Sequence, residues 1–146
     1  CLVPMDGWYE WRPNGELASG KKAPKTPFYM YAGDGEPLFM AGLWSTWRPK
    51  DSAEGTAPLL SCTIITTDAA AHLSDIHDRM PLTISERDWD RWLDPDAPVD
   101  EGLLRGHGDL DRIEIREVSR LVNSIRNNGP ELIEPAEPEP EQGVLL

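Results

Sequence analysis

Two short segments of the 146-residue chain carry side chains that move protons near neutral pH. The first, residues 6–11 (DGWYEW), contains Glu10, and the second, residues 75–81 (DIHDRMP), contains His77. Glutamate and histidine are both common general acids and bases, and each works best when its pKa lies near the operating pH. The two segments therefore predict proton-transfer chemistry.

Glu10 has an indole neighbour if its segment is an extended strand. Side chains of a strand alternate between faces, so Trp8 and Glu10 share one face, and Tyr9 and Trp11 share the other. An apolar neighbour disfavours the ionised carboxylate, so we expect a raised pKa for Glu10. The alternative is a strand that holds one solvent-facing glutamate between core aromatics.

His77 lies between Asp75 and Asp78, and Pro81 restricts the backbone of Met80 to extended geometry. A neighbouring carboxylate orients an imidazole and favours its charged form. A proton-shuttling histidine is one interpretation of this pattern. A surface histidine in a charged turn is the other.

Taken together, the two segments resemble the SOS-response-associated peptidase family, also called the SRAP domain. The similarity continues, in the same order, through residues 1–4 (CLVP), 63–66 (TIIT), 118–119 (VS) and 127–132 (NNGPEL). It covers residues 1–135, which we expect to form one SRAP domain whose amino-terminal part is missing. Residues 136–146 form an acidic, Pro-rich tail that we expect to be disordered, because it has little apolar surface to bury.

The resemblance implies a DNA-repair enzyme that captures abasic sites in single-stranded DNA covalently. Family members use an amino-terminal cysteine, whose amine and thiol condense with the sugar aldehyde to a thiazolidine. Cys1 instead matches an internal cysteine of the family, so the nucleophile is expected outside this chain. Lyase and peptidase activities are further implications of the family.

The resemblance also assigns roles to individual residues. It gives acid/base catalysis to Glu10 and His77, and DNA contacts to Trp11, Thr66 and Arg79. The guanidinium of Arg79 suits a phosphate, because it offers a fork of donors to anionic oxygens.

Three other functions remain open at this stage. A thiol peptidase that removes a leader would use the same cysteine with His77 as base. A non-catalytic reader of single-stranded or modified DNA would stack bases on Trp11 and hold phosphate with Arg79. A carbohydrate-binding surface of tryptophans and carboxylates would leave the histidine segment unexplained.

The overall charge argues against a nucleic-acid partner. Lys and Arg number 14 against 26 Asp and Glu, a net charge of -12, whereas nucleic-acid binders usually have a basic face. Five of these acids are glutamates in residues 131–141, and four more lie in residues 94–101. Without those nine the net charge is -3, which is compatible with a locally positive groove.

Length and composition predict one intracellular domain. No apolar run of about 18 residues is present, and the start lacks a secretory-signal profile, so we expect a cytoplasmic protein with no membrane contact. No Cys and His spacing suits zinc, and we expect neither metal nor cofactor. We expect a monomer, with Cys62 as a buried reduced thiol in an apolar strand.

The expected fold is α+β, a single mixed domain with a strand-rich, barrel-like core and a few short helices. Strands 28–31 and 38–44 flank Gly33-Asp34-Gly35-Glu36 and predict a hairpin. Further strands are expected at 59–66 and 113–118. Asp68 is expected to cap a helix at 69–73, and Ser85 a helix that contains Trp89 and Trp92.

Overall fold

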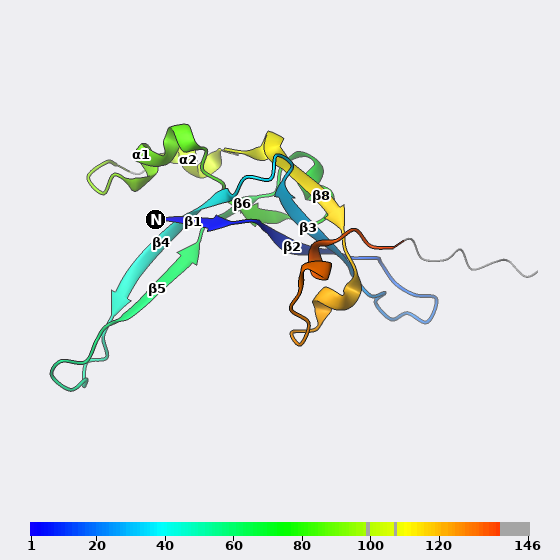
Figure 1. Ribbon diagram of the computed structural model, residues 1–146, viewed down its shortest axis with the longest axis horizontal. Helices are drawn as coiled ribbons and strands as arrows, with labels where there is room; N and C mark the ends of the chain where they lie inside the picture. The colour runs from blue at the N-terminus through cyan, green and yellow to red at the C-terminus, as the bar shows by residue number, and fades with distance from the viewer. Residues whose placement is uncertain (99, 107, 138–146) are drawn as a thin grey trace, which may run out of the picture.

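The computed structural model describes residues 1–98, 100–106 and 108–137, and the expected tail therefore lies mostly outside the described residues. Within these ranges the strands are β1 (Leu2–Met5), β2 (Gly7–Arg12), β3 (Thr26–Ala32), β4 (Leu38–Trp47), β5 (Leu59–Ile64), β6 (Thr66–Asp68), β7 (Arg79–Pro81) and β8 (Ile113–Glu117) (Figure 1). The α-helices are α1 (Trp89–Leu93) and α2 (Glu101–Arg105). The 3-10 helices are η1 (Ala71–Asp75), η2 (Glu86–Asp88), η3 (Leu110–Arg112), η4 (Arg120–Asn123) and η5 (Pro130–Ile133).

The strands form three antiparallel sheets with the orders β1-β4-β5, β2-β3-β8 and β6-β7. The predicted hairpin between β3 and β4 is wrong, because these two strands belong to different sheets. Both edges of β3 are already paired, with β2 and β8, so residues 33–37 instead link one sheet to the other. Arg112 anchors this link by donating to both carboxylate oxygens of Asp34 over 2.8 and 3.1 Å. That bidentate pairing lowers the pKa of Asp34 to about 2.

Backbone hydrogen bonds join the β1-β4-β5 sheet to the residues beside β6 and β7. The N–H of Ala41 in β4 donates to the carbonyl oxygen of Leu82 over 2.8 Å. The N–H of Leu82 donates to the carbonyl oxygen of Ile65, and the N–H of Ile65 donates to the carbonyl oxygen of Ala41, each over 2.9 Å. Because Ile65 turns toward β4 in this way, the strand predicted over residues 59–66 is divided into β5 and β6. The mixed, strand-rich α+β fold that we expected is confirmed.

The main hydrophobic core gathers side chains from β3, β4, η1 and β7. Its most buried members include Met30, Leu38, Met40 and Met80, each at most 2% exposed. A second, smaller cluster contains Ala41, Leu82 and Ile84, and the helical residues Trp89 and Trp92 pack against it. The prediction of a helix that contains these two tryptophans is confirmed, since both lie in α1.

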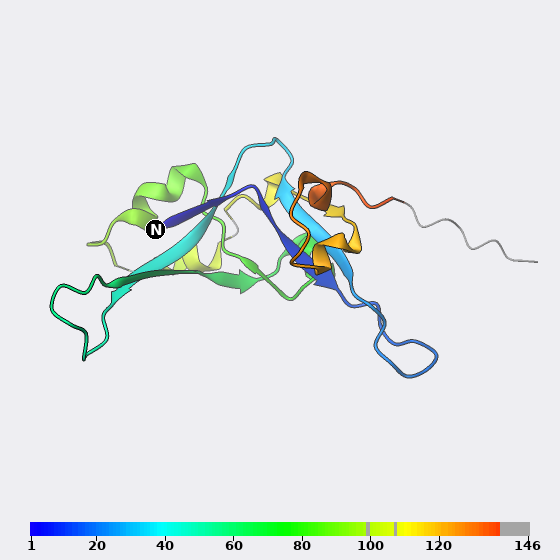
Figure 2. The ribbon, with the colours of Figure 1, turned by 60° about the horizontal axis from the view of Figure 1, so that its bottom comes forward.

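The far halves of β4 and β5 extend beyond the core as a two-stranded arm, closed by residues 48–58 (Figures 1 and 2). We use "the arm" for residues 43–63. Its large exposed apolar side chains are Leu43, Trp44, Trp47, Leu59 and Leu60. Cys62 lies on this arm and is exposed, so the prediction of a buried thiol is wrong. The apolar run that suggested burial does not contact the core over this stretch.

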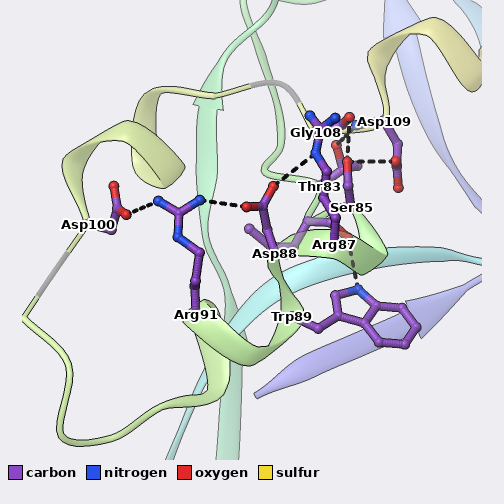
Figure 3. Close-up of polar contacts among 10 residues, drawn as sticks. Thr83, Ser85, Arg87, Asp88, Trp89, Arg91, Asp100, Gly108 and Asp109 are labelled. Atoms are coloured by element: carbon purple, nitrogen blue, oxygen red, sulfur yellow. Dashed lines mark hydrogen bonds and ion pairs between the residues drawn. The ribbon is translucent and has the colours of Figure 1, made fainter.

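Neither predicted side-chain cap forms. Asp68 ends β6 and pairs with Arg79, while η1 begins only at Ala71. The hydroxyl of Ser85 lies 2.6 Å from the carbonyl oxygen of Gly108 and 3.0 Å from Oδ1 of Asp109, and thus joins two loops instead of capping η2 (Figure 3). In the described part of the chain, no helix is both long and apolar enough to cross a membrane.

Candidate active site

Glu10 lies in the middle of β2, on the face that meets the main core. Its cross-strand partner is Phe28, and that of Trp8 is Met30; both partners are buried. Trp8 packs against the same core. The predicted sharing of one face by Trp8 and Glu10 is therefore confirmed, and the carboxylate lies half-buried at the core's edge.

Burial raises the pKa of Glu10 above its ordinary value. The charge of His77, the indole N–H of Trp8 and the charge of Lys25 each lower this pKa, and Asp78 raises it slightly. These groups come from separate parts of the chain, so the fold brings Glu10 and His77 within electrostatic reach of each other. The expected direction of the pKa shift is confirmed.

The ring of His77 is held by the backbone that follows it. Its Nδ1 accepts a hydrogen bond from the N–H of Arg79 over 3.0 Å, and Oδ1 of Asp78 lies 3.2 Å from the same nitrogen. The flanking residues Ile76 and Met80 are 6% and 2% exposed and anchor the segment in the core. These contacts occupy Nδ1, so Nε2 is the ring nitrogen left available for a substrate.

Thr66 and Arg79 meet across the β6–β7 pair. Nη2 of Arg79 donates to the backbone oxygen of Thr66 over 2.6 Å and lies 3.0 Å from its hydroxyl. Nη1 donates to Asp68 over 2.5 Å. The Arg79 side chain is 45% exposed, so a phosphate can approach it, but only in competition with the Asp68 carboxylate.

Trp11 occupies the opposite face of β2 from Glu10. Its ring centroid is 6.3 Å from that of Tyr9, which in turn lies 5.1 Å from that of Tyr29. The indole N–H donates to Oδ1 of Asn123 in η4 over 2.7 Å. Sequence reasoning missed this partner, because nothing local links residues so far apart in the chain. Trp11 is thus not brought onto the Glu10 face.

Cys1 belongs to the other large sheet. Its amino group donates to the carbonyl oxygen of Gly42 over 2.8 Å, and its own carbonyl accepts the indole N–H of Trp92 over 2.8 Å. The amino group at this position therefore has its partner in β4, and the carbonyl has one in helix α1. Among the residues described, no cluster of His, Cys, Asp and Glu is arranged to hold a metal ion.

A cavity of about 760 Å³ lies between the ends of β3 and β8 and the segments η4 and η5. Its charged lining consists of four glutamates and one arginine, namely Glu117, Glu131, Glu134, Glu137 and Arg120. This excess of negative charge does not suit a polyanion. We therefore locate the candidate site at Glu10, His77 and the β6–β7 pair.

A half-buried carboxylate within electrostatic reach of a histidine, on this mixed α+β scaffold, suits proton-transfer chemistry. The chain belongs to the SOS response associated peptidase (SRAP) family, which matches residues 1–125.

Its curated relatives carry a common name. The chain is 38% identical over 139 residues to abasic site processing protein YoqW of Bacillus subtilis, covering 92% of this chain and 56% of that protein. It is 37% identical to abasic site processing protein YedK of Escherichia coli, covering 89% and 54%. It is 32% identical to abasic site processing protein HMCES of Gallus gallus, covering 94% and 44%. The chain thus spans about half the length of the curated relatives it matches.

Solved structures share the fold. A protein from Bacteroides thetaiotaomicron superposes with a TM-score of 0.76 at 28% identity, over 94% of this chain and 56% of that one. A protein from Bordetella bronchiseptica superposes with a TM-score of 0.61 at 27% identity, over 82% of this chain and 54% of that one. In both, as in the curated relatives, close to half of the longer protein lies outside the match.

Proposed function

We propose that the protein takes part in DNA repair by processing abasic sites in single-stranded DNA, and that it does so by forming a covalent thiazolidine with the abasic sugar. The proximity of Glu10 to His77 carries this proposal, because the reaction needs two groups that transfer protons to and from the oxygen, nitrogen and sulfur atoms that bond to one carbon. The names of the relatives support the substrate class. The nucleophile in this scheme is an amino-terminal cysteine other than Cys1.

The first task of the site is to open the closed sugar. Glu10 takes the proton of the anomeric hydroxyl and returns one to the ring oxygen, which exposes the C1′ aldehyde. A carboxylate of raised pKa suits both transfers, since it holds and releases a proton closer to neutral pH than an ordinary glutamate does.

The second task is to replace oxygen by nitrogen and sulfur at C1′. The cysteine amine adds to the aldehyde and gives a carbinolamine, and protonated His77 delivers a proton from Nε2 to its hydroxyl, so that water leaves and an iminium ion forms. His77, now neutral, takes the thiol proton, and the resulting thiolate adds to the iminium carbon and closes the ring. One water is released and no oxidant is required. His77 transfers protons in both formation and hydrolysis of the thiazolidine, so the linkage is reversible. Strand cleavage from the imine is the corresponding lyase reaction.

DNA contacts flank this chemistry on two sides. Thr66 lies on β6, before His77 in the chain, and Arg79 lies on β7, after it. Together they hold the phosphate next to the abasic sugar. Trp11, on the far face of β2, stacks on a neighbouring base, an interaction worth about 1–3 kcal/mol. The protein acts as a monomer in this scheme.

The test uses the reading frame of the chain with any residues that precede Cys1, incubated with single-stranded DNA that bears one abasic site and run on a denaturing gel. The 146-residue chain is the matched control. A shifted band that forms only with the longer protein is the expected result. A shift with the short chain would move the nucleophile to Cys1, and no shift in either lane would contradict covalent capture. Release of a peptide without DNA would favour the peptidase.

A further inference from the structure

The indole N–H of Trp8 is a buried donor without a hydrogen-bond acceptor in the described structure. Buried donors are nearly always paired, because an unmade hydrogen bond in a dry environment is costly. The other indole donors named above follow this rule: those of Trp11, Trp89 and Trp92 all reach an oxygen within 3.1 Å. The exception lies two residues from the candidate catalytic carboxylate.

The strand geometry directs this donor toward Glu10. Trp8 and Glu10 are two residues apart in β2, so their side chains leave the same face. The Trp8 ring packs against the core cluster, and the opposing residues Met30 and Phe28 are apolar, so the facing strand offers no side-chain acceptor. The N–H lies near enough to the Glu10 carboxylate to lower its pKa, although it makes no hydrogen bond of normal length and direction.

From this arrangement we propose that the indole N–H of Trp8 donates a hydrogen bond to the Glu10 carboxylate when that group is ionised. Trp8 is then a positioning residue, which aims the carboxylate along the core face toward His77 and away from solvent. The inference rests on the proposed function for its catalytic meaning, but the hydrogen bond itself does not require that the protein bind DNA.

The strength of the proposed Trp8–Glu10 hydrogen bond depends on the protonation state of Glu10. An ionised carboxylate is a stronger acceptor than a neutral carboxyl group, so the Trp8 contact strengthens when Glu10 loses its proton. The other titratable groups that act on Glu10 are His77 and Asp78 from the loop before β7 and Lys25 from the loop before β3. All three are exposed, whereas Trp8 acts from the buried side, so the carboxylate lies between them.

The direct test is an NMR titration of the uniformly ¹⁵N-labelled 146-residue chain, from about pH 4 to about pH 8, a range that spans the ordinary and raised pKa of a glutamate. The Trp8 indole resonance, assigned by its loss in Trp8→Phe, should shift downfield as Glu10 ionises. In Glu10→Gln the same resonance should not titrate. An indole resonance that is independent of pH, or that titrates unchanged in Glu10→Gln, would overturn the proposal. If Trp8→Phe does not fold, the same resonance is assigned in the native chain from its contacts to Met30 and Phe28, which lie opposite Trp8 and Glu10.

The pH dependence of the reaction gives a second readout. With the longer reading frame, Trp8→Phe should move the acid limb of the cross-linking rate to higher pH, because the ionised form of Glu10 loses a donor. Trp89→Phe is the matched control, since it also removes an indole N–H, one that donates to Ile84 over 3.1 Å (Figure 3). Equal displacement of the limb in both variants would contradict a positioning role for Trp8. Failure of every protein to cross-link would contradict the proposed function and leave the titration result unaffected.

Discussion

The backbone N–H of Arg79 donates to Nδ1 of His77 over 3.0 Å, and this bond assigns different tasks to the two nitrogens of the ring. A backbone N–H is always a donor, so Nδ1 of the neutral ring must accept, and Nε2 then carries the proton. When the ring is protonated, Nδ1 finds acceptors in the carbonyl oxygen of Arg79 at 3.1 Å and the carboxylate of Asp78 at 3.2 Å. Protonation of Nδ1 would therefore replace one accepted hydrogen bond with donated ones and would leave the N–H of Arg79 without this acceptor.

His77→Ala should slow formation of the covalent link by about 10²-fold or more, because proton transfer by a positioned side chain contributes about 10²–10⁴-fold. The measurement is a single-turnover time course on a denaturing gel. Asp78→Asn is the matched control. Its carboxylate is 89% exposed, and an exposed ion pair contributes little, so the rate should change only a few-fold. Equal losses in the two variants would place the effect in the loop and not in the imidazole.

Glu10→Gln should stabilise the fold at neutral pH while it slows the reaction. Burial raises the pKa of Glu10, so the folded protein binds this proton more tightly than the unfolded chain does. The free energy of unfolding therefore falls as pH rises from the ordinary glutamate pKa through the raised one. Glutamine is neutral throughout and avoids this loss.

Urea unfolding at several pH values would measure the effect. The difference between Glu10→Gln and the native chain should be near zero below the ordinary glutamate pKa, about 4.3, and should favour the variant above the raised one. Glu36→Gln, at an exposed position in the link between the sheets, provides the comparison. A variant less stable than the native chain at neutral pH would show that Glu10 is held as a favourable ion pair and not as a desolvated acid.

Arg79→Gln should weaken binding to single-stranded DNA and reduce the slope of log K against log salt by about one, the signature of one lost phosphate contact. Asp68→Asn should act in the opposite direction, since it frees the guanidinium that Asp68 now holds. Fluorescence anisotropy at several salt concentrations would test both. Unchanged salt slopes in both variants would remove Arg79 from the DNA interface.

Gly7→Ala should destabilise the fold by about 1–3 kcal/mol, the usual cost of forcing an extra methyl group into a packed site. A Cβ at this position would lie 2.2 Å from the backbone oxygen of Met30 and 2.5 Å from Cζ of Tyr29. The backbone atom cannot move without opening the β2–β3 ladder, which also carries Glu10. Thermal unfolding would measure the loss. A variant as stable as the native chain would mean that β2 relaxes freely at its start.

The sequence was sufficient for the local features and insufficient for the pairing of distant segments. Alternation of side chains in β2 follows from strand geometry alone, and it placed Glu10 beside Trp8 correctly. The false hairpin between β3 and β4 arose because Gly33-Asp34-Gly35-Glu36 has the composition of a tight turn. The actual role of Asp34 depends on Arg112, which lies far away in the chain.

The prediction that Cys62 is buried is wrong for a related reason. An uncharged, apolar run predicts a strand but does not say whether another element covers it, and on the arm none of the described elements does. Similarly, Asp68 has the properties of a helix cap, yet the cross-strand position of Arg79 offers its carboxylate a charged partner instead. In both cases a long-range neighbour decides between local alternatives.

The exposed arm has a practical consequence for spectroscopy. Two of the six tryptophans, Trp44 and Trp47, are 64% and 59% exposed on it. Their emission should be red-shifted and readily quenched by acrylamide, while Trp8 emits from the edge of the core. The red-shifted, quenchable part of the intrinsic fluorescence therefore reports on the arm's solvent contact. A chain with Phe at positions 44 and 47 would remove this exposed component and leave the emission of Trp8, Trp11, Trp89 and Trp92.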